Sequence, residues 1–354
     1  MKIIILSPSV SLVGGVERFC AYLSSVYRKA GHEAIIISGR SESSLISKFF
    51  VKVGLGVPFI GWQLGREARR QKFDVVVTNG LLGWNLKQKN IINIQHGTFA
   101  AAADRIDRSI NWPKWLMKKY IWGYFEGLAA RRANQVVAVS LETAANVKKY
   151  YHVADVAVIN NAIDTEVFIK LDQRPLRQRL NLPIDKKLAL FVGRFEYGKG
   201  SDIIKKCLPI LAEHDYSLVA ATDRKIIGEN VISLLDLVYV DMPALYSACD
   251  LFIFPSRHEG CSLALLEAMS CELPFLTAPV GSADEIRILA PALRPWICPL
   301  EDFSICLRAR LESDHPDLDL AVRERQIILS HYNPVKFAQE YLALLSNLSD
   351  QQSK

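Results

Sequence analysis

Short apolar runs alternate along the chain with stretches in which apolar residues recur every three or four positions. The runs are expected to form β-strands, and the stretches with helical spacing are expected to form amphipathic helices. In the first half the expected strands are 2–7, 33–38, 73–78, 91–94, 135–139 and 156–159, and helical patterns include 16–30, 60–71, 114–131 and 141–150. Nearly continuous apolar strands such as 75–77 suit a parallel sheet that helices cover on both faces.

The same alternation resumes in the second half of the chain. Here the expected strands are 189–192, 217–221, 251–254 and 274–276, the expected helices are 200–213 and 262–271, and the segments 238–240 and 243–249 continue the alternation. Repeated strand–helix units predict an α/β protein with two Rossmann-like, doubly wound domains.

The polar, turn-prone stretch Asn160–Asp164 marks the expected junction between these domains. The first domain would span 1–160 and the second 161–334, while the helical pattern at 335–348 would let residues 335–354 pack back on the first domain. Open α/β sheets bind ligands beyond the carboxyl ends of their strands, so we expect the two domains to face a central cleft.

The charge of the chain is distributed unevenly. The 354 residues carry a net charge of +6, but residues 1–160 hold 22 Lys and Arg against 10 Asp and Glu. Such a basic half favours an anionic partner, namely phospholipid headgroups, a phosphorylated acceptor or nucleic acid. The seven cysteines are scattered without CxxC spacing, which favours reduced thiols in the cytoplasm. The first apolar run is too short for a signal peptide, and no run is long enough to span a membrane.

Three loops that follow expected strands carry the candidate chemistry. Gly14 and Gly15 precede a helix, where glycines permit close approach of a ligand and the helix N-terminus attracts an anion. The motif is neither a dinucleotide fingerprint nor a P-loop, so a plain turn is the alternative. Arg194 and Lys199 lie in the glycine-rich segment Gly193–Gly200, where a fork and a point charge suit a diphosphate. Two solvated surface cations are the alternative interpretation.

The third loop, after the strand ending at Phe254, contains Glu259, and Ser262 is a good N-cap for the helix that follows. Glu267 lies on the second turn of that helix. One carboxylate could face the reacting end of a ligand while the other reaches a diol, and the backbone amides near Ser262 and Leu263 favour an anion. The alternative is an amphipathic helix with an incidental upstream glutamate.

Taken in order, these segments resemble glycosyltransferase family 4, a retaining family with the GT-B fold. Glu259 and Glu267 match its Glu-x7-Glu signature, and the Gly193–Gly200 segment matches its Gly-Arg…Lys-Gly segment. Gly14-Gly15 matches its first glycine loop, and Asn161–Asp164 matches its Asn-Gly-Val-Asp junction. Two departures are Ala162 in place of the junction glycine, and a missing proline between Gly193 and Lys199. They affect local backbone detail and remove no charge.

The resemblance implies a role for each site residue. Arg194 and Lys199 would grip the donor diphosphate, and Gly14 and the amide of Gly15 would approach it from the other domain. Glu267 would bind the ribose hydroxyls. Glu259 would contact the transferred sugar. The further donor-binding positions are the amides of Cys261, Ser262 and Leu263, and His96, in the Gln95-His96-Gly97 loop, would lie beside the donor sugar as a catalytic residue.

The sequence therefore predicts a retaining hexosyltransferase that moves a sugar from a nucleoside-diphosphate donor to a glycan or lipid-linked acceptor in surface polysaccharide or lipopolysaccharide biosynthesis. No cofactor or metal is expected, because two cations stand in for one, and Asp317-Leu318-Asp319 is interpreted as a surface or helix-start feature. A nucleotide-sugar hydrolase or epimerase and a non-catalytic nucleotide-sugar binder remain alternatives.

Residues 105–132 combine three tryptophans with seven lysines and arginines. Indole rings and cations favour the headgroup region of an anionic membrane, which would place the protein peripherally on the inner face of the plasma membrane. A core-facing aromatic helix with a solvated basic face is the alternative. No recognised nucleic-acid-binding motif accompanies the charge, so we expect no nucleic-acid partner.

Overall fold

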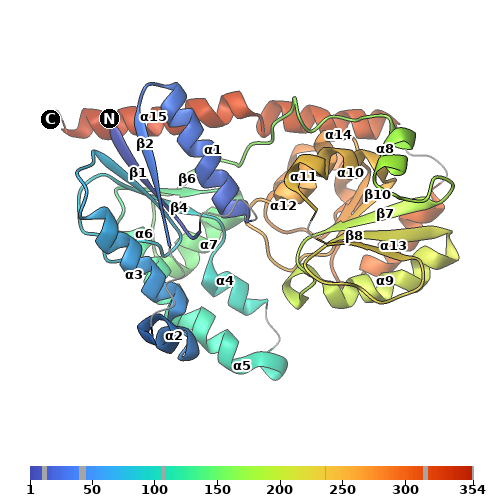
Figure 1. The fold of residues 1–354 in the computed structure, drawn as a ribbon, viewed down its shortest axis with the longest axis horizontal. Coiled ribbons are helices and arrows are strands. Elements are labelled where there is room, and N and C mark those ends of the chain that lie inside the picture. The colour runs from blue at the N-terminus through green and yellow to red at the C-terminus, as the bar shows by residue number, and fades with distance from the viewer. Residues whose placement is uncertain (10–13, 40–44, 106–107, 236, 314–317, 353–354) are drawn as a thin grey trace. The chain divides into compact units, whose positions relative to one another are not determined.

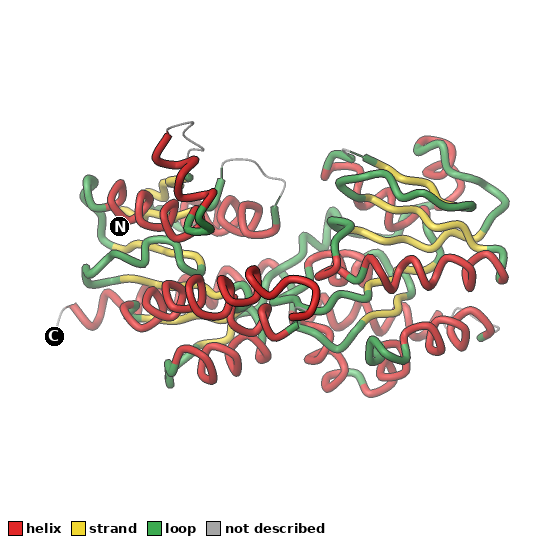
Figure 2. Tube along the Cα trace, turned by 90° about the horizontal axis from the view of Figure 1, so that it is seen from below, coloured by secondary structure: helices red, strands yellow, loops and turns green. Residues whose placement is uncertain are grey.

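The computed structural model describes residues 1–9, 14–39, 45–105, 108–235, 237–313 and 318–352 (Figure 1). The chain forms two compact units. Unit 1 comprises Met1–Asn161 and Phe337–Lys354, and unit 2 comprises Ala162–Lys336. The division falls within the polar stretch Asn160–Asp164, and the residues after Phe337 belong to unit 1. In each unit the strands lie between helices (Figure 2).

Unit 1 is built on one parallel sheet of six strands in the order β2-β1-β3-β4-β5-β6. Their bounds are β1 (Lys2–Ser7), β2 (Glu33–Ser38), β3 (Val75–Asn79), β4 (Ile91–Gln95), β5 (Gln135–Ala138) and β6 (Ala157–Val158). Every residue of β3 and β4 is buried, as their apolar composition predicts. All six strands expected from the sequence are present.

The helices of unit 1 differ from the sequence-based expectation in one region. They are α1 (Gly15–Lys29), α2 (Leu45–Lys52), α3 (Gly56–Ala68), α4 (Phe99–Asp104), α5 (Arg108–Leu116), the π-helical segment η1 (Met117–Trp122), α6 (Gly123–Arg132), α7 (Leu141–Tyr151) and α15 (Pro334–Gln352), whose residues from Phe337 lie in this unit. The helical pattern expected over 114–131 is confirmed, although it is divided among three helical segments and is not one uniform α-helix. It runs through α5, η1 and α6, because the wider turn of a π-helix keeps the chain helical while shifting which side chains face the core.

Unit 2 is built on a parallel sheet of five strands in the order β11-β10-β7-β8-β9. Their bounds are β7 (Lys187–Val192), β8 (Tyr216–Ala221), β9 (Val231–Leu234), β10 (Leu251–Phe254) and β11 (Phe275–Thr277). The strand suggested at 238–240 is wrong, since the chain forms a short 3-10 helix there and β9 lies earlier. Val238 and Val240 are 58% and 78% exposed, so their apolar character does not reflect burial in a sheet.

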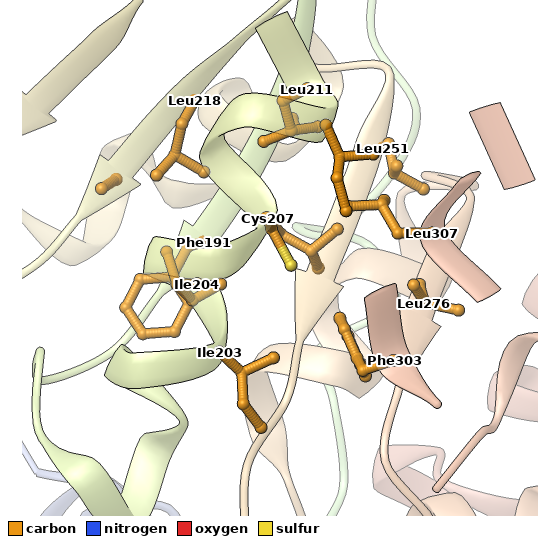
Figure 3. Close-up of a cluster of buried hydrophobic side chains, with 14 of the residues drawn as sticks. Phe191, Ile203, Ile204, Cys207, Leu211, Leu218, Leu251, Leu276, Phe303 and Leu307 are labelled. Carbon is orange, nitrogen blue, oxygen red and sulfur yellow. The ribbon is translucent and has the colours of Figure 1, made fainter. Parts of the chain in front are cut away.

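The core of unit 2 shows how these elements assemble. Its helical segments are α8 (Gln173–Arg179), η2 (Tyr197–Lys199), α9 (Ser201–Glu213), η3 (Tyr239–Asp241), α10 (Met242–Ala248), α11 (Leu263–Ser270), α12 (Ser282–Leu289), η4 (Pro291–Trp296), α13 (Phe303–Glu312) and α14 (Leu318–His331). Ile203, Ile204, Cys207 and Leu211 form one stripe on α9 and pack with strand residues and with α13 (Figure 3). This packing fixes α9 against the sheet and positions the loop that precedes it.

The strand orders place the candidate loops. In unit 2, β7 lies at the centre and is followed on one side by β8 and on the other by β10, so the loops after β7 and β10 leave neighbouring strands. This is the topological switch point at which open α/β sheets bind ligands. The segments Gly193–Gly200 and Pro255–Ser262 begin at these two strand ends.

A buried ion pair closes the opposite end of the unit 2 sheet. The Arg177 side chain is 5% exposed, and its Nη2 lies 2.7 Å from Asp250 Oδ2. Its remaining donors bind backbone carbonyls, including those of Ala248 and Lys186 at 2.8 Å each. Asp250 Oδ2 also accepts the N–H of Leu188 at 2.6 Å. The pair thus ties α8 to the first residues of β7 and β10.

Replacing Arg177 by methionine is expected to lower the free energy of unfolding by about 3 kcal/mol, because Asp250 and several carbonyls lose their donor. Chemical denaturation measures the change. Arg179→Met is the matched control on the same helix, since its ion pair with Asp241 is solvent-exposed and such pairs contribute about 0–1 kcal/mol. Equal effects of the two substitutions would contradict the structural role assigned to Arg177.

Candidate functional site

The loops after β7 and β10 touch each other in unit 2. Gly200 adopts a φ of +78°, and a Cβ atom at this position would lie 2.1 Å from the carbonyl oxygen of Pro255. Only glycine allows this close approach with a positive φ. The N–H of Arg257 donates to the carbonyl of Gly198 at 2.9 Å. The two candidate loops therefore form one continuous surface at the switch point.

Lys199 and Glu259 meet on this surface. The ammonium of Lys199 lies 2.6 Å from Glu259 Oε1, and the two side chains are 25% and 12% exposed. The hydroxyl of Ser256 donates to the same carboxylate oxygen at 2.6 Å. Because both bonds converge on one oxygen, the carboxylate is held in place while both charged groups keep some access to solvent. Two site residues predicted from the sequence are thus brought into direct contact.

Arg194 lies differently. Its side chain is 69% exposed and pairs with Glu196 of its own loop at 3.0 Å. Of the two cations predicted to grip a diphosphate, Lys199 is therefore positioned by the fold, whereas Arg194 extends from the loop surface. Because this guanidinium is exposed, its desolvation costs little free energy, and it can turn toward an anion.

Sequence reasoning missed a second ion pair that joins the same loops. Arg257 binds Asp202 through two parallel hydrogen bonds of 2.7 and 2.8 Å, and its guanidinium stacks 3.7 Å from the centre of the Tyr197 ring. Burial acts to raise the pKa of Asp202, but the hydrogen bonds and charge of Arg257 outweigh it and lower that pKa. Neither residue belongs to a recognised motif, and only the loop contact brings them together. The Arg257–Asp202 pair thus stabilises the position of the segment that carries Lys199.

The N-terminus of α11 is capped as expected, but one of its amides is engaged. The hydroxyl of Ser262 accepts the N–H of Leu265 at 3.3 Å, which confirms the predicted N-cap. The N–H of Ser262 itself donates to Ser282 Oγ at 3.2 Å, so this amide, predicted to favour an anion, is already engaged. Leu263 is the first residue of α11, and a first-turn amide has no acceptor within its own helix. Cys261 is buried just before the cap. The donor-binding roles of these amides stay predictions.

Glu267 is 2% exposed and is held by two tyrosines. Tyr239 donates its hydroxyl to Glu267 Oε1 at 3.0 Å, and Tyr246 donates to Oε2 at 2.8 Å. Tyr246 is fully buried, whereas Tyr239 is 45% exposed. The predicted role of Glu267 toward ribose stays a prediction.

In unit 1, the glycine loop leads directly into α1. Gly14 is the N-cap residue in an extended conformation, and Gly15 begins the helix. The carboxylate of Glu17 occupies the space beside Gly14, where an added Cβ would lie 2.0 Å from Glu17 Oε2. Ser9 donates to the other oxygen of this carboxylate at 3.2 Å. An acidic side chain thus lies at the helix N-terminus, where negative charge is stabilised, beside the glycines predicted to approach a diphosphate.

His96 lies just past the end of β4 and contacts the end of β3. Its Nε2 is 2.8 Å from Asn79 Oδ1, and its ring meets Phe19 edge to face at 4.7 Å. The amide nitrogen of Asn79 donates to the carbonyl of Leu6 at 2.7 Å, so Asn79 Oδ1 is the acceptor and His96 carries its proton on Nε2. Burial lowers the pKa of His96 to about 4. The imidazole is therefore neutral at physiological pH, with Nδ1 as an acceptor.

A buried carboxyl supports the loop that follows His96. Glu126, 3% exposed, accepts the N–H of Phe99 at 2.7 Å and the hydroxyl of Tyr151. Burial raises the pKa of Glu126 to about 7, against the opposing effect of these two hydrogen bonds. The Gln95–Phe99 segment is thus anchored to α6 and α7 by a group that titrates near neutrality.

The aromatic and basic segment 105–132 divides between core and surface. Trp122 donates its indole N–H to the carbonyl of Gly54 at 2.8 Å and packs with the core. Trp112, Tyr120 and Tyr124 are about 60% exposed, at 63%, 59% and 58%. Several of the cations bind within unit 1: Lys119 pairs with Asp104, and Arg131 and Arg132 donate to backbone carbonyls. Part of the segment therefore packs in the core, as the alternative interpretation expects, and the membrane contact of its exposed part stays a prediction.

Within the described ranges, no group of three or more His, Cys, Asp and Glu side chains could hold a metal ion. Asp317, the first residue of the Asp317-Leu318-Asp319 sequence, lies outside those ranges, and α14 begins at Leu318. Among the described helices, none is both long and apolar enough to cross a bilayer. All seven cysteines are free thiols.

Two units of parallel α/β architecture, with candidate loops at the carboxyl ends of their strands, define the GT-B class of fold. Sucrose-phosphate synthase from Thermosynechococcus elongatus matches with a TM-score of 0.78 at 16% identity, over 99% of this chain and 100% of that chain. HepE of Anabaena, solved in complex with UDP and glucose, matches with a TM-score of 0.70 at 15% identity, over 98% and 100% of the two chains. At these identities the similarity establishes the fold.

The family follows from the sequence. Residues 13–167 match the family described as Glycosyltransferase Family 4, and residues 172–289 match Glycosyl transferases group 1. This chain belongs to the family 4 glycosyltransferases, as its motifs predict. D-inositol 3-phosphate glycosyltransferase of Mycobacterium tuberculosis is 33% identical over an alignment of 144 residues that covers 36% of this chain. The matched segment spans 30% of the length of that relative.

The titration of Glu126 predicts a pH-dependent stability. The unfolded chain releases this proton near pH 4.5, whereas the folded chain keeps it until about pH 7. The free energy of unfolding therefore includes a contribution that is fully present below pH 4.5 and is lost as the pH rises through 7, amounting to at most about 3 kcal/mol. Glu126→Gln keeps an acceptor for Phe99 and Tyr151 and should flatten the profile, measured by denaturation across this range.

Glu67→Gln is the control, because Glu67 is exposed and paired with Arg70 on the surface of α3. Burial also raises the pKa of Glu324 in unit 2 to about 8. This carboxyl therefore also lowers the free energy of unfolding as the pH rises, and Glu126→Gln leaves that contribution unchanged. A Glu126→Gln profile as steep as that of the unsubstituted protein would show that this carboxyl does not titrate as assigned.

Proposed function

We propose that this protein is a retaining, metal-independent glycosyltransferase that moves a hexose from a nucleoside-diphosphate donor to a glycan or lipid-linked acceptor. The observation that carries the proposal is the contact between Lys199 and Glu259 at the switch point of unit 2, 2.6 Å apart and close to the N-terminus of α11. Membership of family 4 supports the reaction class, and retention of configuration is inferred from the family.

Glycosyl transfer breaks the bond between the anomeric carbon and the diphosphate. Negative charge grows on the leaving phosphate while positive charge grows on the sugar ring. A fixed cation directed at the phosphate therefore stabilises the transition state more than the ground state. Lys199 supplies such a cation, because Glu259 and the loop contact hold it in place. Arg194, exposed on the same loop, adds a second cation that can close on the bound diphosphate.

Glu259 is assigned to the transferred sugar. Its Oε1 is already engaged by Lys199 and Ser256, so its remaining acceptor capacity is directed to sugar hydroxyls. Glu267, Gly14, Gly15 and His96 keep the donor-contacting roles implied by the family resemblance. His96 would act there as a neutral hydrogen-bonding group, in keeping with its low pKa.

The acceptor and the location belong to the same proposal. The basic first half of the chain and the exposed aromatics of 105–132 support peripheral association with an anionic membrane. Free thiols throughout are in keeping with a reducing compartment on the inner face of that membrane. One solved structure of the same fold is of WaaG, described as a glycosyltransferase involved in lipopolysaccharide biosynthesis. We propose a corresponding place in surface polysaccharide or lipopolysaccharide assembly.

Lys199→Ala should reduce turnover by about a hundred- to a thousand-fold, the usual effect of removing one preorganised donor to a developing anion. Turnover is measured as release of nucleoside diphosphate in the presence of acceptor, and circular dichroism checks that the variant is folded. Lys206→Ala, an exposed lysine on α9, is the matched control and should leave turnover unchanged. Unchanged turnover in Lys199→Ala would remove the central cation from the mechanism.

A thermal-shift screen of nucleoside diphosphates and their sugars identifies the donor for this assay, because a ligand that binds only the folded state raises its stability. The same donor should stabilise Lys199→Ala less than the unsubstituted protein. Free sugar or an epimerised donor formed without acceptor would instead identify a hydrolase or an epimerase.

The membrane contact predicts co-sedimentation with vesicles. Recovery should be higher with vesicles that contain anionic lipid than with neutral ones, and should fall as salt screens the charges. Replacing the exposed Trp112 and Tyr120 together by serine should lower recovery severalfold, while the same replacement of exposed Tyr197 in unit 2 should not. Equal recovery with neutral and anionic vesicles would end the membrane proposal.

A further inference from the structure

An apolar groove lies on unit 1, apart from the loops described above. It has a volume of about 280 Å³. Its walls come from α2, the start of α3, the segment after β3, and α6. The seven residues that line it are all apolar: Phe50, Leu55, Pro58, Phe59, Trp62, Trp84 and Phe125. Most of these side chains are only partly buried. Large apolar side chains that share an open hollow are typical of a binding site for an apolar ligand.

The walls of the groove are built from stacked aromatic rings. Phe50 and Phe59 stack at 4.3 Å with 8° between their planes, and Trp62 continues the stack at 5.9 Å from Phe59. On the other side Trp84 packs on Phe125 at 4.6 Å. The indole N–H of Trp84 donates to the carbonyl of Pro58 at 2.8 Å, so the polar atom of that ring is already satisfied. The groove therefore presents flat hydrocarbon faces.

The surface around the groove is apolar as well. Phe49, Val51 and Val53 precede the groove residues of α3 and are 61%, 63% and 47% exposed. On the opposite side the exposed Tyr124 meets the groove residue Phe125 edge to face at 5.5 Å. The hydrogen bond from Trp122 to Gly54 joins these two sides. The groove thus adjoins Tyr124, one of the exposed aromatic residues that the membrane proposal uses; Figure 1 shows α2 and α3, which carry one wall, in unit 1.

Cations stand at the edge of the groove. The guanidinium of Arg66 lies 5.5 Å from the centre of the Trp62 ring, on the exposed face of α3. Lys52, the last residue of α2, is also exposed and belongs to the segment between Phe50 and Leu55. A cation beside an apolar hollow complements an amphiphile that has an anionic head and a hydrocarbon tail.

We propose that this groove binds one hydrocarbon chain of an anionic membrane lipid, with the phosphate of its headgroup held by Arg66. The chain packs between the Phe50–Phe59–Trp62 stack and the Trp84–Phe125 pair, and Lys52 adds positive charge at the rim. Binding extends the membrane contact proposed above from a surface attraction to a defined lipid site. It requires no sugar transfer, so the two proposals fail separately.

Alkyl phosphates of eight and twelve carbons, kept below the concentration at which they form micelles, test the groove on the full-length protein. Burial of methylene groups strengthens binding by up to about tenfold for every two carbons. The twelve-carbon chain should therefore bind at least about tenfold more tightly than the eight-carbon chain in isothermal titration. A twelve-carbon phosphate with a diazirine at its tail should cross-link to residues between Phe50 and Trp62 or to Trp84 and Phe125.

Two variants test binding of the hydrocarbon chain, and one tests binding of the phosphate. Leu55→Trp fills the groove with apolar volume, and Phe59→Ser removes one wall; each should weaken binding of the twelve-carbon phosphate by at least about tenfold. Either one suffices if the other fails to fold. Arg66→Gln should lower affinity for the phosphate severalfold and leave binding of a neutral twelve-carbon maltoside unchanged.

Phe49→Ser is the matched control, because Phe49 is exposed beside the groove but does not line it. It should leave monomeric chain binding unchanged. Lys199→Ala should also bind the chain normally, which separates this test from that of the transferase. Equal affinity for the two chain lengths, cross-links outside the groove, or a dimer in sedimentation that Leu55→Trp dissociates would overturn the proposal.

Discussion

The contact between Lys199 and Glu259 depends on two loops of unit 2 lying against each other. Because the strands are parallel, the loops that follow them lie at the same edge of the sheet. The strand order makes β7 and β10 neighbours, so their loops are adjacent at that edge. Gly200 then lets the first loop approach the carbonyl of Pro255, and a carboxylate that would otherwise face water meets an ammonium at 2.6 Å. A side chain on Gly200 would push the loops apart and separate the charges. The chemistry assigned to unit 2 therefore rests on backbone geometry as much as on the charged residues.

The two units carry different kinds of polarity at their candidate sites. In unit 2, Lys199 and Glu259 are partly exposed and pair with each other, whereas Glu267 is buried and is held by tyrosine hydroxyls. In unit 1, the pKa of the part-buried His96 is lowered to about 4, and burial raises the pKa of Glu126 to about 7. The positive charge of the first half of the chain lies elsewhere, at positions such as Arg66 on exposed helix faces. Unit 1 thus combines neutral hydrogen bonding near β4 with a basic and aromatic exterior.

Most of the sheet architecture could be predicted from the sequence, because buried parallel strands are short apolar runs bounded by polar turns. The glycine-rich segments and the Glu259–Glu267 spacing could be placed for the same reason, since each follows such a run. The failures have local causes. The strand β9 is short and only partly buried and was not predicted, whereas the exposed run at 238–240 was included in the alternation. The π-helical turns of η1 leave no distinct spacing, and tertiary partners such as Ser282 for the Ser262 amide lie far away in sequence.

The two tyrosines on Glu267 have a consequence for how such a protein can diverge. Tyr246 is enclosed in the core and donates to one oxygen of the carboxylate, whereas Tyr239 donates to the other from the short 3-10 helix η3, where it is 45% exposed. Substitution in η3 therefore alters the surroundings of one oxygen, while the hydrogen bond from Tyr246 to the other oxygen stays in place. The exposed side of this carboxylate can change over generations more readily than its buried side.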